Sequence, residues 1–400
     1  MDNQLPLVPV EEIERRYRRF QQTLDRMELD GALIAQNIDL YYLTGTMQNG
    51  LLFVPRKGEP CLYVKKSVAR AKRESSVPVE QMGRMRELPQ RMAERFGPVQ
   101  RVGMELDVLP YAQATFYADK LFPKAELTDI SFPLRLQRAV KSDYELNQLK
   151  RAAGCVREIV EALPEMLKPG MREVELVAEI ERRLRMKGNI NLYRMRAFNQ
   201  ELVLGMVASG AAAAAPTYFD GPAGGMGLST ASPQGAGWKE IRVGEPILVD
   251  ISAVIEGYII DQTRLAVIGE LEDDLEHAYG VARQILKATE EKAKPGVTWE
   301  SLYMDALKMA EEAGLADHFM GYGEDQAKFL GHGVGLELDE LPVLARGFDQ
   351  PLEEGMVIAV EPKFTFPGRG VIGIENTYVV TADGLKSLTT ASEEIVRVRA

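Results

Sequence analysis

Two aspartates stand in neighbouring apolar runs within residues 246–269. Asp250 and Asp261 are eleven residues apart, and Glu256-Gly257 between the runs is a candidate two-residue turn. In a β-hairpin closed by this turn, Ser252 would lie opposite Asp261, and both aspartates would point to one face about 7–8 Å apart at the backbone. Ionised carboxylates inside an apolar sheet each cost several kcal/mol and also repel one another. The pair therefore predicts a bound cation, for which a metal ion is the obvious candidate.

Three residues nearer the C-terminus complete a candidate metal site. His332 lies between Gly331 and Gly333, which we expect to leave room for a ligand, and Glu361 and Glu375 each end an apolar run. We expect no basic residue in those runs to neutralise the acids. The sequence leaves open whether Glu361 and Glu375 share a face. Four carboxylates and one imidazole suit two divalent ions that share bridging carboxylates, about 3.5–4 Å apart.

These segments resemble the pita-bread metallopeptidase family. The likeness rests on the aspartates eleven apart, on GHGVGLE with His332, on EEGMVIAVEP with Glu361 and on GIENTYVVT with Glu375, and it covers essentially the whole chain. The family includes Xaa-Pro dipeptidases (prolidases), Xaa-Pro aminopeptidases and methionine aminopeptidases, with creatinase as a non-peptidase relative that has lost the metal set.

The resemblance implies a role for each residue of the set. Asp250, Asp261, His332, Glu361 and Glu375 would hold two divalent ions, with manganese favoured over cobalt, iron or zinc. Asp261 and Glu375 would bridge the ions, and Glu361 would help to activate the attacking water. The resemblance also implies a homodimer.

Three positions depart from the family pattern. The family's second histidine, seven residues after the first, is Asp339 here, and the histidine that follows the proline of the ASGxxxxxP segment is Thr217. An arginine two residues before the last glutamate is replaced by Gly373. In the family, the two histidines and the arginine stabilise the tetrahedral intermediate and bind the substrate's carboxylate. We therefore place Asp339 with His332 and Glu361 among the catalytic positions, Thr217 and Gly373 among the substrate-binding ones, and expect an altered substrate preference.

Three functions fit this set of residues. The first is a metal-dependent hydrolase that cleaves short peptides before proline, as an aminopeptidase or a dipeptidase. The second is a hydrolase of a non-peptide C–N bond in a small nitrogenous metabolite, which the missing histidines and arginine favour. The third is a non-catalytic binding protein. A binding protein would have no need to keep four carboxylates that are unfavourable to bury, which argues against this function.

The elements that must position these residues indicate an α/β (α+β) chain with two domains. Residues 11–29 have the apolar spacing of an amphipathic helix, and the β-type runs GALIAQ, LLFVP and PCLYVKK follow it. We expect an N-terminal, creatinase-like α/β domain over residues 1–138 that has no acidic cluster in an apolar setting and carries no chemistry. A pseudo-symmetric pita-bread catalytic domain would occupy residues 139–400, beginning with a helix capped by Ser142 and Glu145.

The second domain contains a faint repeat and a long loop. Lys168-Pro169-Gly170 and Lys294-Pro295-Gly296 each join two helical patterns, which indicates duplicated halves, although Lys-Pro-Gly is also a common turn. The Gly-, Ala- and Pro-rich stretch from 204 to 245 is expected to lack regular structure. It would form a lid or wall at the site, the alternative being a surface insertion.

The composition of the chain indicates its partners and its cellular compartment. The 400 residues are 46% hydrophobic, carry a formal charge of −11, and contain two cysteines, Cys61 and Cys155. The charge argues against nucleic acid or an anionic membrane as a partner, and no apolar run approaches the roughly 20 residues of a membrane span. The few cysteines and the absence of a signal-like N-terminus favour the cytoplasm. The expected partner is a small peptide or a nitrogenous small molecule.

Overall fold

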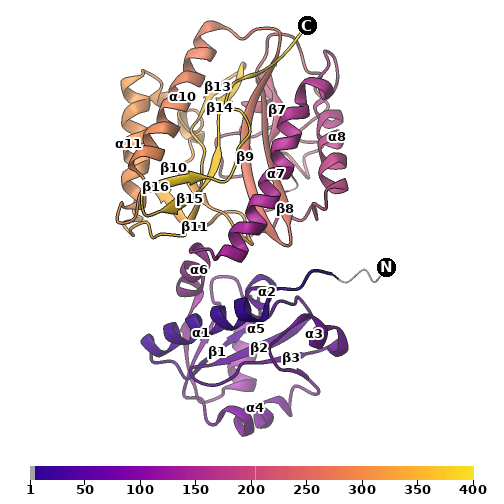
Figure 1. Cartoon of the computed structure of the whole chain (residues 1–400), viewed down its shortest axis with the longest axis vertical. Coiled ribbons are helices and arrows are strands. Elements are labelled where there is room, and N and C mark those ends of the chain that lie inside the picture. Colours follow the sequence, from indigo (N-terminus) through magenta and orange to yellow (C-terminus); the bar gives the residue numbers. More distant parts are fainter. Residues whose placement is uncertain (1–4, 203) are drawn as a thin grey trace. The chain divides into compact units, whose positions relative to one another are not determined.

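The computed structural model describes residues 5–202 and 204–400, and the chain divides into two compact units, Met1–Gln137 and Arg138–Ala400 (Figure 1). This division lies one residue before the predicted boundary. Both units mix helices with sheets, which confirms the predicted fold class. Among the described residues, no helix is both long and apolar enough to cross a membrane.

The first unit is a six-stranded mixed sheet covered by helices. The sheet order is β4-β3-β2-β1-β5-β6, with strands β1 (Gly31–Ile34), β2 (Gly50–Pro55), β3 (Cys61–Val64), β4 (Val79–Gln81), β5 (Arg101–Met104) and β6 (Glu126–Asp129). The helices are α1 (Val10–Arg26), α2 (Asn37–Thr44), α3 (Val68–Glu74), α4 (Leu88–Phe96), α5 (Tyr111–Leu121) and α6 (Ser131–Ala139), the last of which spans the division between the units. The helix and the three strands predicted for this region are confirmed.

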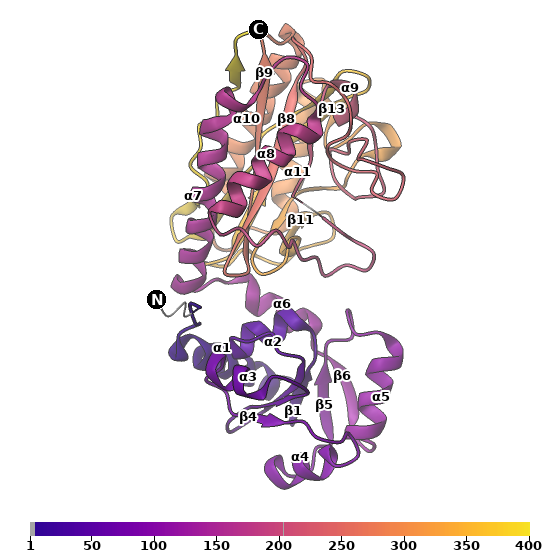
Figure 2. The same cartoon turned by 90° about the vertical axis from the view of Figure 1, so that its right-hand side faces the viewer.

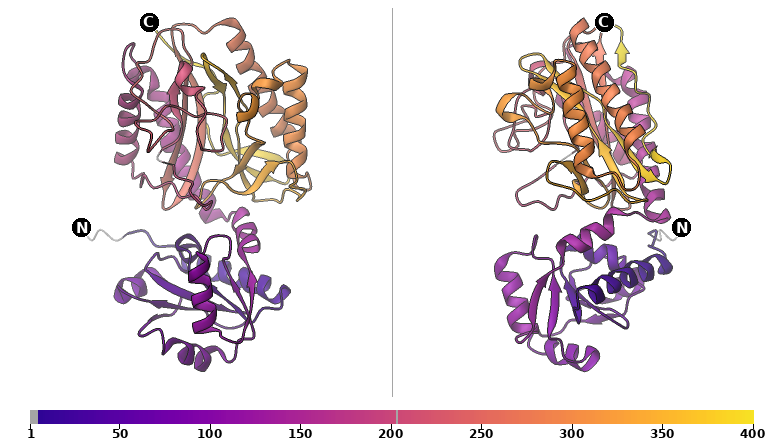
Figure 3. Two further views of the ribbon diagram at one scale, coloured as in Figure 1. Left: turned by 180° about the vertical axis from the view of Figure 1, so that it is seen from behind. Right: turned by 90° about the vertical axis from the view of Figure 1, so that its left-hand side faces the viewer.

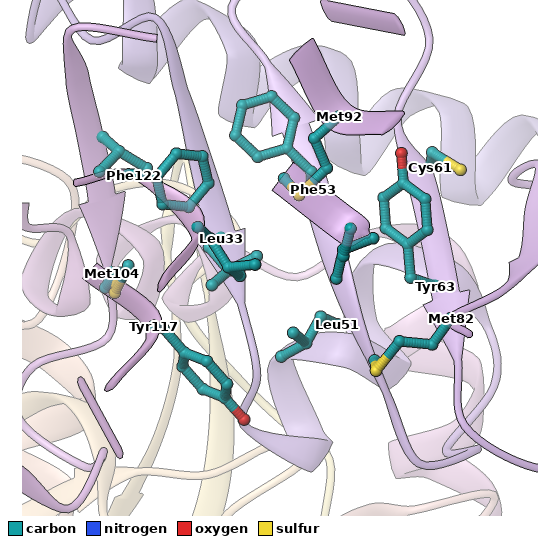
Figure 4. Close-up of a cluster of buried hydrophobic side chains, with 13 residues drawn as sticks. Leu33, Leu51, Phe53, Cys61, Tyr63, Met82, Met92, Met104, Tyr117 and Phe122 are labelled. Atoms are coloured by element: carbon teal, nitrogen blue, oxygen red, sulfur yellow. The ribbon is translucent and has the colours of Figure 1, made fainter. Parts of the chain in front are cut away.

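One face of this sheet carries an apolar core. Met92 of α4 and Tyr117 of α5 pack against Leu33, Phe53 and their neighbours on the strands, as Figure 4 shows. Burial of this kind stabilises a domain by roughly 25 cal/mol for each Å² of apolar surface removed from water. The first unit therefore has its own core.

The expectation that this unit lacks an acidic pair in an apolar setting is wrong. Asp39 and Glu105 are both fully buried, and Glu105 accepts hydrogen bonds from the backbone N–H groups of Ala35 (2.8 Å) and Gln36 (3.2 Å). Burial raises the pKa of Glu105 well above its usual value, and the neighbouring Asp39 raises it further. The two acids lie far apart in the sequence and come together only when the sheet forms.

The second unit contains two pairs of helices with strands between them (Figures 1 and 3). The sheets have the orders β17-β9-β8-β7, β11-β10-β12-β15-β16 and β13-β14. The helices are α7 (Asp143–Met166), α8 (Glu173–Met186), α9 (Gly210–Ala213), α10 (Asp273–Lys292) and α11 (Trp299–Glu312), with the 3₁₀ turns η1 (Ala316–His318) and η2 (Gly323–Asp325). The strands are β7 (Val207–Ser209), β8 (Ile247–Ile255), β9 (Tyr258–Ile268), β10 (Phe329–Gly333), β11 (Glu340–Ala345), β12 (Val357–Val360), β13 (Lys363–Phe366), β14 (Gly370–Gly373), β15 (Asn376–Thr381), β16 (Gly384–Ser387) and β17 (Val396–Val398).

The two helix pairs have matching connections. A Lys-Pro-Gly turn joins α7 to α8 and another joins α10 to α11, and each turn is tied to a later segment by its glycine N–H. Gly170 donates to the carbonyl of Ile241 and Gly296 to that of Leu352, both at 2.9 Å. Helix α7 begins with the predicted capping box of Ser142 and Glu145. Figure 2 shows α7 and α8 in front of β8 and β9, and the predicted duplicated halves are therefore seen in the fold.

The stretch from 204 to 245 is only partly irregular. Strand β7 lies within it and pairs antiparallel with β8, Val207 opposite Val249, and the four-residue helix α9 follows. The expectation of no regular structure is wrong for these residues. A three-residue strand is too short to show an alternating pattern, and β7 is held by its pairing with β8.

Candidate metal centre

The hairpin of β8 and β9 positions both aspartates. Ser252 lies opposite Asp261 and Asp250 opposite Thr263, which is the predicted register. The turn residues Glu256 and Gly257 have φ angles of 49° and 87°, as a turn that follows the right-handed twist of a hairpin requires. Ser252 Oγ donates to Asp261 Oδ1 at 2.9 Å, which fixes that carboxylate and leaves its Oδ2 available.

His332 lies on β10, between β11 and β12 in the five-stranded sheet. Its Nδ1 lies 3.1 Å from the carbonyl oxygen of Gly333, so a proton on Nδ1 leaves the Nε2 lone pair facing Asp261 and Glu361. We expected the flanking glycines to make room for a ligand, but backbone from neighbouring strands lies against them instead. A Cβ at Gly331 would lie 2.1 Å from the carbonyl oxygen of Ala359, so this glycine allows the close approach of β12.

The hairpin of β13 and β14 brings the two glutamates together. Its register pairs Lys363 with Gly373, and continuing that register by two residues places Glu361 opposite Glu375. Both side chains line one small cavity of about 50 Å³ together with those of Asp250, Asp261 and His332. The five predicted residues therefore converge, and the two glutamates share a face.

Three of the five side chains are spaced so that they could hold one ion. Asp261, His332 and Glu375 each offer a ligand atom, and these atoms all lie within 4.8 Å of one another. His332 Nε2 is 4.0 Å from Asp261 Oδ2 and 3.5 Å from Glu361 Oε1. Glu375 Oε1 is buried and has no hydrogen-bond partner among the residues that the structure describes. A buried carboxylate oxygen of this kind needs a partner, and a divalent ion fits the mixed oxygen and nitrogen donors.

A basic residue that was not predicted from the sequence lies at the centre of these acids. The Nζ of Lys363 lies 3.1 Å from Asp250 Oδ2, 2.6 Å from Glu361 Oε2 and 3.3 Å from Glu375 Oε2. The expectation that no basic residue neutralises the acids is therefore wrong. Lys363 begins β13 two residues after Glu361, and in extended chain residues two apart point to the same side.

Burial and charge shift the pKa values of the cluster. Burial raises the pKa of Asp261 well above its usual value, and the charges of Glu375 and Asp250 add to the shift. Burial also raises the pKa of Glu361, although Lys363 opposes it. Burial alone would lower the pKa of Lys363, but the three surrounding carboxylates raise it well above its ordinary value. The ammonium is therefore charged at neutral pH.

Two of the three departures from the family pattern lie at the cluster. Asp339 lines the cavity and its Oδ1 is 3.4 Å from His332 Nδ1. Gly373 lies across from Lys363, and a Cβ at this position would be 2.4 Å from Lys363 Cγ. Thr217 lines a neighbouring hollow instead, where its Oγ1 accepts a hydrogen bond from the N–H of Phe219 at 3.2 Å.

The loop before β8 supplies part of the cavity wall. Residues 219–223 line the cavity. The apolar side chains of Met206, Phe329 and Leu338 line it as well and were not predicted from the sequence. The loop therefore acts as a wall of the site, one of the two roles expected of it.

Comparison with known proteins identifies the family. Residues 147–382 match the model of metallopeptidase family M24, and residues 16–140 match the creatinase/prolidase N-terminal domain. The Xaa-Pro dipeptidase of Pyrococcus horikoshii is 28% identical over 390 residues, which cover 96% of this chain and 99% of that protein.

Solved structures agree with the sequence matches. The prolidase structure from Pyrococcus horikoshii has a TM-score of 0.79 at 27% identity and covers 96% of this chain and 100% of its own. The dipeptidase PepE structure from Mycobacterium ulcerans has a TM-score of 0.81 at 25% identity, with coverages of 99% and 100%. The metallopeptidase model covers more than half of the chain, and the N-terminal unit matches a domain model as well. This chain therefore belongs to metallopeptidase family M24.

Proposed function

We propose that this chain is an Xaa-Pro peptidase that cleaves short peptides before proline with the help of bound divalent metal. The observation that carries the proposal is the convergence of Asp261, His332 and Glu375 in one cavity, where each offers a ligand atom within 4.8 Å of the others. Glu375 Oε1 is also buried and has no hydrogen-bond partner among the described residues. The similarity to Xaa-Pro dipeptidases over nearly the full length supports the substrate class.

The chemistry follows from where the side chains lie. When bound, a divalent ion supplies a Lewis acid that polarises the scissile carbonyl and lowers the pKa of a water molecule. Glu361 lies beside the proposed ligands with a raised pKa, so its carboxylate can take a proton from the attacking water and return it to the leaving nitrogen. Met206, Phe329 and Leu338 offer an apolar wall to the substrate's side chains.

We also propose manganese as the metal, a homodimer as the assembly and the cytoplasm as the location. Oxygen-rich donor sets suit Mn²⁺, which supports the first of these. Cys61 and Cys155 are both free thiols in the structure, which supports a reducing compartment. The homodimer rests on the family resemblance.

The proposal is tested with the full chain loaded with Mn²⁺ or Co²⁺. We expect hydrolysis of Xaa-Pro dipeptides or of longer Xaa-Pro peptides, and little hydrolysis of matched peptides that have alanine in place of proline. Glu361→Gln should lower kcat by about 10²- to 10⁴-fold, as the loss of a general base does. Glu324→Gln, an exposed carboxylate outside the cluster, is the matched control. Metal-loaded protein that cleaves no Xaa-Pro peptide would contradict the proposal.

A second candidate function is the hydrolysis of a non-peptide C–N bond in a cationic small molecule. The observation that favours it is the carboxylate of Asp339, which lines the cavity where the family has a histidine. A carboxylate attracts an amino or amidinium group but cannot donate a hydrogen bond to an oxyanion when it is ionised. Comparing cyclic amidines with Xaa-Pro peptides, before and after Asp339→His, separates the two functions.

A further inference from the structure

The ammonium of Lys363 lies among oxygens that the two-ion prediction assigns to metal. Its Nζ contacts Asp250 Oδ2, Glu361 Oε2 and Glu375 Oε2 at 3.1, 2.6 and 3.3 Å. The lysine side chain is 1% exposed, so the charge is held inside the protein by these contacts. A lysine with three buried carboxylate partners is an ion-pair site in its own right.

A metal ion that used the same three oxygens would coincide with this ammonium. Carboxylate oxygens bind divalent transition metals at about 2.0–2.2 Å, so the ion would have to occupy the space between the three oxygens that Nζ now fills. The residues present therefore do not fit an ion at this position.

The rest of the lysine side chain is built into the β13–β14 hairpin. Lys363 pairs with Gly373 in the register, and a Cβ at Gly373 would lie 2.4 Å from Lys363 Cγ. The backbone carbonyl of Lys363 accepts a hydrogen bond from the N–H of Met320 at 2.8 Å. The position that holds arginine in the family pattern has thus lost its side chain where the lysine stem needs the space.

The two glutamates divide their oxygens between the ammonium and the remaining site. Glu361 directs Oε2 to Lys363 and its Oε1 lies 3.5 Å from His332 Nε2. Glu375 Oε2 accepts a hydrogen bond from Thr263 Oγ1 at 2.8 Å and lies 3.3 Å from Lys363 Nζ, while its Oε1 is buried and without a partner among the described residues. One set of oxygens faces the lysine, and the other set remains for one ion with Asp261 and His332.

We infer that the Lys363 ammonium takes the place of one of the two metal ions, so that the chain binds a single divalent ion at Asp261, His332 and Glu375. The inference rests on the metal site of the proposed function, but it does not depend on which bond is cleaved. It replaces the two ions expected from the sequence by one ion and one permanent cation.

The test counts ions in the full chain. Metal-free protein is titrated with MnCl₂ by calorimetry, and bound manganese is measured by elemental analysis after dialysis. The wild-type chain should bind one Mn²⁺ and give the electron paramagnetic resonance spectrum of an isolated ion. Lys363→Gly, which removes both the charge and the stem, should bind two and show coupling between them. Lys386→Gly on the exposed face of β16 is the matched control and should bind one.

The outcomes separate this inference from the proposed function. Two ions, or none, in the wild-type chain would overturn the inference, and this measurement needs no variant to fold. A single ion in a folded Lys363→Gly variant would also overturn it. One bound ion without Xaa-Pro hydrolysis would overturn the proposed function alone, whereas two ions with that hydrolysis would overturn the single-ion inference alone.

Discussion

Asp339 is placed to orient the histidine of the metal site. Its Oδ1 is 3.4 Å from His332 Nδ1, while the same nitrogen lies 3.1 Å from the Gly333 carbonyl oxygen. Partners on the far nitrogen of a ligating histidine fix its ring and its tautomer and make it a better ligand. In the proposed metal site, the residue that departs from the family pattern would therefore hold the histidine from its far nitrogen.

We predict that Asp339→Ala weakens metal binding by about 10- to 100-fold, the usual cost of removing such a partner. Competition of the protein with a chelating dye for Mn²⁺ measures the affinity. Asp349→Ala, at an exposed position, should leave it unchanged. Unaltered affinity in Asp339→Ala would mean that the Gly333 carbonyl alone orients the ring.

Among the single residues of the site, the acids were predicted from the sequence, whereas the basic residue between them was not. A carboxylate within a Val- and Ile-rich run stands out, and Asp250, Asp261, Glu361 and Glu375 were found for that reason. Lys363 was not predicted to be buried, because a lysine beside a proline is typical of a surface. Its partners are Asp250 of β8 and the two glutamates that precede β13 and follow β14. A close look at strand parity, with Glu361 and Lys363 two residues apart, would have placed them on one face.

The β8–β9 hairpin is the element on which the aspartates depend. Both turn residues have positive φ angles, which glycine adopts without strain and a residue with a Cβ does not. Asp250 and Asp261 are carried on the two strands that leave this turn, so the turn fixes their register.

We predict that Gly257→Ala lowers the free energy of unfolding by about 1 kcal/mol or more, because alanine is strained at a φ of 87°. Gly280→Ala is a control of opposite sign. This glycine lies inside α10 and a Cβ there would meet no atom within 4 Å, so alanine should stabilise by up to about 1 kcal/mol. Denaturant unfolding of both variants measures the difference. Equal effects would show that the turn geometry does not constrain the hairpin.

Elements with long periodic patterns were predicted well, and short or paired ones were not. Helices α1 and α7 carry an apolar face over several turns, so the sequence indicates them directly. Strand β7 is three residues long and owes its shape to β8. The glycines beside His332 were noticed in the sequence, but their role was misread as room for a ligand. Only the folded sheet shows that a neighbouring strand lies against them.

The second unit as a whole joins two similar halves around one cluster of charge. The β8–β9 hairpin after the first helix pair contributes Asp250 and Asp261. After the second helix pair, β10 contributes His332, and the short links β12–β13 and β14–β15 contribute Glu361 and Glu375. The repeat of Lys-Pro-Gly made this arrangement predictable. Which oxygen of each acid meets which cation depends on packing between the halves, which no single segment of the sequence encodes.

Titration of this cluster should make the stability of the metal-free unit depend on pH. Burial, with the charges of Glu375 and Asp250, raises the pKa of Asp261 well above its usual value, so the folded chain keeps a proton that the unfolded chain releases above about pH 4. Burial alone would lower the pKa of His332, but Asp339 and Glu361 raise it above 6.5. Both shifts give stability that is present at low pH and is lost as the pH rises through the folded pKa values.

Two other shifted groups do not disturb this trend near neutrality. Although burial opposes it, Arg138 and Lys141 hold the pKa of Glu340 down at about 2, so the stabilisation by this group is complete above about pH 4.5. The pKa of Lys363 is raised well above 10.5, so its contribution is complete below that pH. Between pH 5.5 and 8 the slope therefore comes mainly from the metal-site groups.

We predict that the stabilisation of the second unit by Mn²⁺ grows as the pH rises from 5.5 to 8. The ion binds deprotonated ligands, so each proton that it displaces makes binding up to about tenfold tighter per pH unit, or about 1.4 kcal/mol. Both tryptophans, Trp238 and the buried Trp299, belong to this unit, so their fluorescence during urea unfolding, with Mn²⁺ or with a chelator, measures the difference. Asp261→Ala should remove most of the difference at every pH. A stabilisation that stays constant across this range would mean that the ligands are already deprotonated in the metal-free fold, against the pKa directions argued for Asp261 and His332.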